Sequence, residues 1–380
     1  MKEPKIRFKG FCGEWKNTSI GKECSVNRGI RITRKELSVQ GLYPVYQNTD
    51  YPMGYYNRSN VKANNPFVII GGSAGLIGFS KCDFWAADDC AYFGDSSNLD
   101  KVCLYSLLLR RSLEIKKNVR SSSVPRLDRK ILLDLKIALP ALEEQQVLGS
   151  YFQHLDTLIQ STTKKIESLK QVKAASLQSM FPQEGETKPR VRFKGFEGEW
   201  EKLKADEIFK AFNEKNFPHL PVLSATQDRG MVMREEIGYN IFHDKSNEKT
   251  YKHILPGQFV IHLRSFQGGF AHSSIEGIAS PAYTVMEFKN KSRHSDLFWK
   301  YIFMSKEFIK RLELITYGIR DGRSISFEEF SDMYFFVPFC EEQTAIASYL
   351  TNLDTQITLQ TQRLEKLKQI KSACLDNMFV

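Results

Sequence analysis

The chain has 380 residues, 42% of them apolar and 12% aromatic, which is typical of a folded protein long enough for two or three domains with their own cores. No run of about 18 apolar residues and no signal-peptide apolar region occurs, so neither a transmembrane helix nor a secretory leader is predicted. Seven cysteines without a CxxC pair favour a reducing, cytoplasmic setting over a disulfide framework or zinc ribbon, and a net charge of +10 is compatible with a polyanionic partner.

Two segments of the chain occur twice. Residues 4–15, PKIRFKGFCGEW, return as residues 189–200, PRVRFKGFEGEW; we call these the head segments. The motifs EEQ, SY, LDT and MF of Glu143–Phe181 return in the same order in Glu341–Phe379. The two inserts between these repeats show little similarity to each other: Lys16–Pro125 and Glu201–Arg323. A duplicated scaffold with divergent inserts favours a bivalent recognition protein over an enzyme with one active site.

The second head segment has apolar, basic and glycine residues in quick succession, and we expect strands and turns there rather than a helix. In the first insert, short apolar runs between glycine and asparagine clusters predict strands, and a helix is predicted to follow at Val102–Leu113. The predicted strands are Tyr43–Tyr46, Phe67–Ile70 and Ala91–Phe93. Gly71–Gly78 is rich in glycine, and this pattern fits a tight turn near a ligand or DNA, a phosphate cradle, or an ordinary loop.

A long helix is predicted after Pro140, where two glutamates follow the proline and the next 39 residues contain one glycine and no proline. Apolar residues recur in heptad-like steps through both copies of this helix. They are Leu148, Phe152, Leu155, Ile159, Ile166, Leu169 and Met180, and Ile346, Leu350, Leu353, Ile357, Leu364, Leu367, Cys374 and Met378. We expect the two helices, each roughly 58 Å long, to pack antiparallel.

Polar residues interrupt this seam at Thr162, Lys173, Gln360 and Lys371, and such interruptions can fix register at some cost in stability. The helical pair could serve as a dimerisation device or as a rigid spacer between the inserts. In the second insert, Gln258–Leu263 and Ala282–Phe288 are predicted strands, and Asp296–Arg311 is a predicted helix.

The predicted architecture is therefore α+β, with two α/β recognition domains separated by a pair of long antiparallel helices and related by a pseudo-twofold duplication. The predicted boundaries are 1–140 for the first domain with its head segment, 141–182 for the first helix, 183–188 for a polar linker, 189–338 for the second domain, and 339–380 for the second helix.

Motifs for catalysis are scarce. No GxxxxGK[ST] occurs, so no P-loop is predicted. Asn64–Phe67, NNPF, is one residue away from the Asn-Pro-Pro-Phe motif of amino-methyltransferases, and no glycine motif for the cofactor accompanies it. Six of the seven histidines lie between His219 and His294, without HExxH or HxH spacing and without an intervening cysteine, so we predict neither a metal site nor a catalytic site.

Recognition of bases is better supported. Arg and Lys bond guanine edges, and Asn and Gln bond adenine edges, when a rigid loop presents them. Basic residues interleaved with amides and aromatics make both inserts candidates for groove contact, although for any one residue surface solubility is the stronger explanation. The candidates are Arg28, Arg31, Arg34, Lys35, Gln47, Asn48, Tyr55, Tyr56, Asn57 and Arg58 in the first insert, and Gln227, Arg229, Arg234, Arg264, Ser265, Gln267, Arg320 and Arg323 in the second.

The repeated pattern resembles the DNA specificity subunit of type I restriction–modification systems. The resemblance rests on Pro140 and Pro338, each followed three residues later by EEQ, and on the RFKGFxGEW head segments. In the second insert, Gly277–Tyr283 also looks like a segment common in one class of target recognition domains. The resemblance covers essentially the whole chain.

The resemblance implies a subunit without catalytic activity, in which each recognition domain reads half of a split target in double-stranded DNA and the helices set the gap. It implies two modification (methyltransferase) subunits that bind S-adenosylmethionine and methylate adenine N6, and motor-nuclease restriction subunits that cleave unmethylated DNA. This chain is then expected to bind no cofactor. The sequence does not define the target, the spacer length, which insert reads which half-site, or whether a nuclease partner exists.

Two other classes of protein remain open from the residues alone. A solitary DNA methyltransferase would bind S-adenosylmethionine unaided. A bivalent adaptor that joins proteins would keep its affinity between roughly 50 and 200 mM salt, where affinity driven by phosphate contacts falls steeply.

Overall fold

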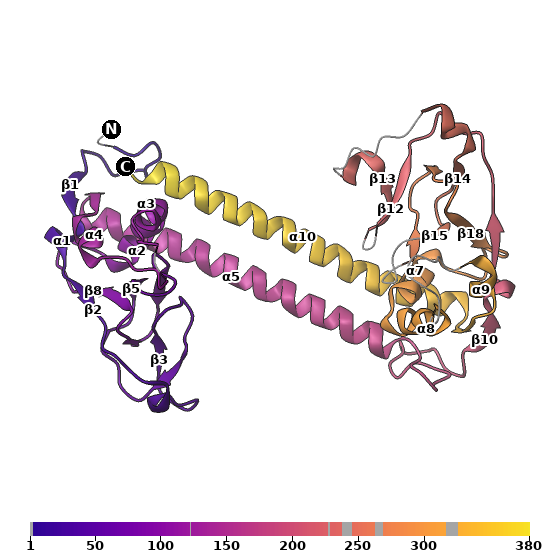
Figure 1. The fold of residues 1–380 in the computed structure, drawn as a ribbon, viewed down its shortest axis with the longest axis horizontal. Coiled ribbons are helices and arrows are strands. Elements are labelled where there is room, and N and C mark those ends of the chain that lie inside the picture. The colour runs from indigo at the N-terminus through magenta and orange to yellow at the C-terminus, as the bar shows by residue number, and fades with distance from the viewer. Residues whose placement is uncertain (1–2, 122, 227–228, 238–244, 263–268, 317–325) are drawn as a thin grey trace. The chain divides into compact units, whose positions relative to one another are not determined.

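The computed structural model describes residues 3–121, 123–226, 229–237, 245–262, 269–316 and 326–380, coloured in Figure 1. The chain forms two compact units. Unit 1 comprises Met1–Lys165 and Gln360–Val380, and unit 2 comprises Ile166–Leu359. Each unit therefore contains one insert and parts of both long helices. Among the described residues, no helix has the length and apolar character needed to cross a membrane.

Unit 1 holds its insert on a two-stranded base, where the strand that enters the insert pairs antiparallel with the strand that leaves it: β1 (Lys16–Ser19) and β9 (Lys136–Leu139). Above this base lie an antiparallel sheet of order β2-β8-β5-β6 and a smaller sheet of order β4-β3-β7. These strands are β2 (Val26–Arg28), β3 (Tyr43–Tyr46), β4 (Gly54–Tyr56), β5 (Asn65–Ile69), β6 (Ile77–Ser80), β7 (Trp85–Ala86) and β8 (Cys90–Phe93).

Helices cover the larger sheet of unit 1, with α2 packed against β5 and β6. The helices of this insert are α1 (Ile20–Glu23), η1 (Arg34–Glu36), α2 (Lys101–Arg110), α3 (Ser112–Lys117) and α4 (Arg129–Asp134). The side chains of Leu104, Leu108 and Phe93 are fully buried between these layers. In Figure 1 the β3 region lies at the end of unit 1 away from α5.

Unit 2 uses the same base with different strands above it. Strand β10 (Glu201–Lys204) pairs antiparallel with β19 (Tyr334–Val337), as β1 does with β9. Above the base lie a four-stranded sheet of order β11-β18-β15-β16 and two strand pairs, β12-β13 and β14-β17. These strands are β11 (Phe209–Phe212), β12 (Leu223–Thr226), β13 (Gly230–Met233), β14 (Lys252–Ile254), β15 (Phe259–Ile261), β16 (Phe270–His272), β17 (Gly277–Ala279) and β18 (Thr284–Phe288).

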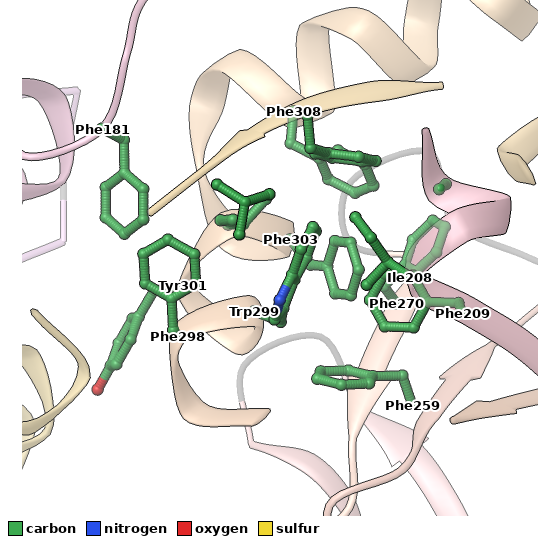
Figure 2. Close-up of a cluster of buried hydrophobic side chains, with 14 of the residues drawn as sticks. Phe181, Ile208, Phe209, Phe259, Phe270, Phe298, Trp299, Tyr301, Phe303 and Phe308 are labelled. Atoms are coloured by element: carbon green, nitrogen blue, oxygen red, sulfur yellow. The ribbon is translucent and has the colours of Figure 1, made fainter. Parts of the chain in front are cut away.

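Aromatic side chains build the core of unit 2 (Figure 2). The Phe209 ring lies 4.9 Å from Trp299 and 5.0 Å from Phe288, measured between ring centroids, and Phe303 lies 4.9 Å from Phe270. Such contacts join the four-stranded sheet to the neighbouring helices through large apolar areas. The helices of this insert are α6 (Ala205–Ile208), η2 (Arg234–Ile237), η3 (Lys245–Thr250), α7 (Asp296–Met304), α8 (Lys306–Thr316) and α9 (Phe327–Ser331).

Two long helices follow the inserts as predicted: α5 (Leu142–Ser179), with 38 residues, and α10 (Cys340–Met378), with 39. In unit 1 the start of α5 runs antiparallel to the end of α10, since Phe152 stacks on Phe379 and Tyr151 hydrogen-bonds with Cys374 at 3.4 Å. In unit 2 the start of α10 packs against the end of α5, since the hydroxyl of Tyr349 in α10 lies 3.3 Å from the hydroxyl of Ser176 in α5. In each unit the apolar stripe at the start of one long helix is therefore buried against the end of the other long helix.

The lysines that interrupt the stripe form ion pairs across the helices. Lys371 Nζ lies 2.5 Å from Asp156 in unit 1, and Lys173 binds Asp354 at the equivalent place in unit 2. Each ammonium group also lies near a tyrosine ring of the neighbouring insert helix, Tyr105 or Tyr301. Burial raises the pKa of Tyr105 to about 12, which keeps the phenol neutral beside the pair. The repeated polar interruption thus holds one register in both units.

The EEQ motif connects three parts of each unit. Arg7 of the head segment donates two hydrogen bonds to Glu144, at 2.8 and 2.7 Å, and the Glu144 side chain is only 2% exposed. This carboxylate raises the pKa of Arg7 above its usual value. Gln145 accepts a hydrogen bond from the backbone N–H of Asp100, the N-cap of α2, and donates to the carbonyls of Asn98 and Pro140. The motif therefore joins the head segment, the long helix and the insert.

The second copy repeats this arrangement. Arg192 donates to Glu342 at 2.8 and 2.7 Å, and Gln343 accepts from the backbone N–H of Ser295, the N-cap of α7, at 2.9 Å. Gln343 also donates to the carbonyls of Arg293 and Pro338. We call the Arg–Glu–Gln contacts of each copy the clamp.

Three local predictions need correction. The head segments contain turns but no strand among residues 4–15 and 189–200; their glycines adopt positive φ, as at Gly10 and Gly13, and the strand begins only at Lys16. The helix predicted at Val102–Leu113 is two helices separated at Arg111. The helix predicted at Asp296–Arg311 is also two, because Ser305 is extended and its hydroxyl accepts a hydrogen bond from the backbone N–H of Phe308.

We predict that Arg7→Ala lowers the free energy of unfolding of unit 1 by about 3 kcal/mol, because it leaves the buried Glu144 carboxylate without its cation. Urea unfolding followed by tryptophan fluorescence measures this change. The double variant Arg7→Ala/Glu144→Leu should recover most of the stability, since no charge is then buried alone. If the double variant is no more stable than the single one, the clamp does not act through this ion pair.

Candidate nucleic-acid interface

The basic residues predicted in the first insert begin on β2 and continue into η1. Arg28 is held by the backbone, since its Nε donates to the Asp88 carbonyl at 2.6 Å. Arg31, Arg34 and Lys35 are exposed. The short helix that carries Arg34 and Lys35 is closed by a capping box, in which the Glu36 carboxylate accepts from both the backbone N–H and the hydroxyl of Thr33. These cations therefore stand on an ordered turn.

The residues predicted on β4 divide by exposure. Tyr55, Asn57 and Arg58 are exposed, whereas Tyr56 is half-buried with its ring 5.1 Å from that of Trp85. The Tyr56 ring therefore supports the small sheet. Tyr55, Asn57 and Arg58 remain candidates for contact with a ligand.

Gln47 and Asn48 lie beyond the other end of the β3-β4 ladder. Tyr43 pairs with Tyr56 in this ladder, so Arg58 extends past one end and Gln47 past the other. Asn48 instead adjoins the glycine-rich turn, where a Cβ added to Gly72 would lie 3.1 Å from the Asn48 Cβ. The structure thus separates the predicted residues of this insert into two groups.

In the second insert the described candidates lie on the β12-β13 hairpin. Arg229 is exposed in the turn, with its guanidinium 3.7 Å from the Glu236 carboxylate. Arg234 is half-buried, donates to the Ser224 hydroxyl at 3.3 Å and lies over the Tyr251 ring. Arg234 therefore helps to hold the hairpin. Six further candidates lie outside the described residues: Gln227, Arg264, Ser265, Gln267, Arg320 and Arg323.

Two described histidines of the second insert, His253 and His294, serve its packing. His253 is buried between the carboxylates of Glu214 and Glu276, at 3.2 and 2.9 Å. His294 is buried against the Phe288 ring, and desolvation together with Arg293 lowers its pKa to about 4, so it is neutral at pH 7. Among the residues that the structure describes, no group of three or more His, Cys, Asp and Glu could hold a metal ion.

Three of the four residues of Asn64–Phe67 are part of the core. Asn65, Pro66 and Phe67 are buried in β5, and the Asn65 amide donates to the Phe93 carbonyl at 2.9 Å. Asn64, the residue that matches the asparagine of the Asn-Pro-Pro-Phe motif, is exposed just before β5, and Asn65 occupies the position of the motif's first proline.

The ion pairs between the head segments and the long helices were not predicted from the sequence. Their residues, Arg7, Glu144, Arg192 and Glu342, were noted there only because they belong to the repeated motifs. An indirect signal is present, since an arginine in each head segment and the second glutamate of each EEQ recur together. The contact could not be read from the chain, because Arg7 and Glu144 are 137 positions apart.

Comparison with known proteins identifies the family. The model of the type I restriction modification DNA specificity domain matches residues 13–171 and again residues 197–369. A type I restriction enzyme MjaVIII specificity subunit from Methanocaldococcus jannaschii is 26% identical over 397 aligned positions, covering 96% of this chain and 91% of that protein. The fold is similar to the crystal structure of the S subunit of a type I restriction-modification system from M. genitalium, with a TM-score of 0.71, 15% identity, and coverage of 100% and 99%.

The chain belongs to the family of type I restriction–modification DNA specificity subunits. Proteins of this kind recognise DNA sequence and are non-catalytic components of their complexes. The exposed residues of the inserts are therefore candidates for DNA contact, and the repeats form the scaffold that holds them.

We predict that Arg34→Ala/Lys35→Ala weakens DNA binding at every sequence tested and lowers the slope of log Kd against log salt concentration by about two, because each cation that faces a phosphate contributes about one to this slope. Titrations between about 50 and 200 mM salt measure the slope. The matched control is Lys116→Ala/Lys117→Ala, which removes two exposed lysines from α3. Equal slopes for the two double variants would contradict a phosphate contact at η1.

Proposed function

We propose that this chain reads a split DNA target, with one half-site for each insert, and directs adenine N6 methylation by two modification subunits. The observation that carries the proposal is the combination of identical clamps with different inserts. Both units repeat the strand pair at the base, a four-stranded antiparallel sheet and the Arg–Glu–Gln contacts, while the smaller sheets differ: β4-β3-β7 in unit 1, and the pairs β12-β13 and β14-β17 in unit 2. Two different surfaces on one kind of scaffold suit two different half-sites.

The repeats also support the proposed partners. Each unit presents the start of one long helix against the end of the other, with the same Lys–Asp pair. Two equivalent helical surfaces suit two copies of one partner, as a pseudo-twofold duplication requires. We expect these partners to be methyltransferase subunits, and motor-nuclease subunits to join them for cleavage of unmethylated DNA.

S-adenosylmethionine is expected on the modification subunits. In this chain the segment nearest to a methyltransferase motif, Asn64–Phe67, has Asn65 in place of the motif's first proline, and Asn65 is buried and bonded to a neighbouring strand. The role of this chain is then to hold the DNA so that the partner can reach adenine.

The first experiment is to co-express this chain with its presumed modification subunit in a host without DNA methylation, and to map methylated adenine across the genome. We expect one split motif that is absent without this chain. A stable complex that binds its methyl donor and yet yields no motif would overturn the proposal and favour an adaptor between proteins.

A second prediction is that the length of the two long helices determines the number of base pairs between the half-sites. The register that pairs Lys173 with Asp354 places Gln171 opposite Gln356, so seven residues added after Gln171 and seven before Gln356 lengthen both helices and keep the heptad phase. Seven residues extend a helix by about 10 Å. We expect the spacer to grow by about three base pairs, at about 3.4 Å each, with both half-sites unchanged.

Methylation mapping of this lengthened variant measures the spacer directly. A change of bases within either half-site would contradict the proposal that the helices act as a ruler. A variant with seven residues added after Gln171 alone is the control, because it displaces one helix against the other and should disrupt the complex.

A further inference from the structure

A small apolar projection lies on the first insert between η1 and β3. Val39 is 96% exposed and Leu42 is 75% exposed, and Gln40 between them is exposed as well. Tyr55 of β4, which pairs with this loop through Ser38, is also exposed. We call Val39, Gln40 and Leu42 the tip. A folded protein gains no stability from holding two aliphatic side chains in water side by side on one loop.

The backbone holds the tip in one conformation. Ser38 donates its backbone N–H to the Tyr55 carbonyl at 2.9 Å, and the Ser38 hydroxyl accepts from the backbone N–H of Gln40 at 3.1 Å. Gly41 lies so close to β4 that a Cβ there would be 2.6 Å from backbone atoms of Tyr55 and Tyr56. Leu37, just before the tip, packs over Gly54 in a small core. The apolar side chains are therefore presented on a braced loop, which lowers the entropy cost of binding.

The charges around the tip favour DNA as the occupant over a protein. Residues 28–58 contain five basic and only two acidic side chains. One of the acids, Glu36, is occupied by its capping box, while Arg34 and Lys35 are exposed a few positions before the tip. Basic residues on both sides of an apolar point in the chain suit a DNA groove, where phosphates flank the base edges.

We propose that the tip reads one or two A·T pairs in the major groove of one half-site, with Val39 and Leu42 against the thymine methyl group of each pair and the Gln40 amide on a paired adenine. This inference rests on the proposed function. Aliphatic side chains carry no donor or acceptor, so the thymine C5 methyl group is the feature of the major groove that they can recognise. A glutamine amide can bond adenine N6 and N7 together.

The test uses the complex of this chain with its modification subunits and duplexes that carry the mapped target. Each thymine in turn is replaced by deoxyuridine, which removes only the methyl group. The affinity of the wild-type complex should fall about fourfold at one or two thymines of a single half-site, the effect of one buried methyl group. Val39→Ala/Leu42→Ala should bind the thymine duplex more weakly and no longer distinguish it from deoxyuridine at those positions.

The matched control is Leu113→Ala on α3, which removes an aliphatic side chain that is 74% exposed but lies outside the tip. This control should keep the full sensitivity to deoxyuridine. Gln40→Ala should make one A·T position of the mapped motif degenerate. The tip proposal is overturned if neither half-site shows a sensitive thymine, or if Val39→Ala/Leu42→Ala keeps the sensitivity.

Two other results distinguish a failure of the tip proposal from a failure of the proposed function. If Val39→Ala/Leu42→Ala binds DNA normally but no longer binds the modification subunit, the tip is a protein contact and the proposal is wrong. If the wild-type complex shows no split motif and no sequence preference on any duplex, the proposed function itself has failed, and deoxyuridine would then make no difference at any position.

Discussion

The structure depends on a buried carboxylate that must keep its cation. Glu144 and Glu342 are each 2% exposed, and each is neutralised by two hydrogen bonds from an arginine of a head segment. The glutamine that follows satisfies the N-cap residue of an insert helix. An uncompensated charge in such a place is strongly destabilising, so the head segment, long helix and insert must fold together. The clamp thereby fixes where an insert begins on its scaffold while leaving the insert free to differ.

The second constraint is that neither repeat completes a unit by itself. The start of each long helix buries its apolar stripe against the end of the other, and the lysine that interrupts the stripe binds an aspartate of the opposite helix. A lysine placed in an apolar seam is costly unless its partner is in register, so the polar interruption selects one alignment of the helices. Within each unit the two helices therefore pack in a single register.

The inserts show how different surfaces can be held by the same scaffold. The first insert uses a small sheet with exposed basic and apolar residues on braced turns, while the second uses an aromatic core with strand pairs above it. Several polar residues that looked like readers of bases have structural partners: Arg28 binds the Asp88 carbonyl, and Arg234 binds Ser224. The candidates for DNA contact are therefore the side chains that packing leaves exposed.

The duplication, the two long helices, several of the short strands and the family could all be predicted from the residues in order, because these features are periodic or local and need no knowledge of distant contacts. The same residues narrowed the candidates for DNA contact to two inserts. The folded chain was needed to show that Arg7 belongs to Glu144, that the head segments are turns, that Tyr56 supports a sheet, and that Val39 and Leu42 project from it. The physical reason is that burial and pairing depend on residues far apart in the chain, and composition along a single segment carries no information about them.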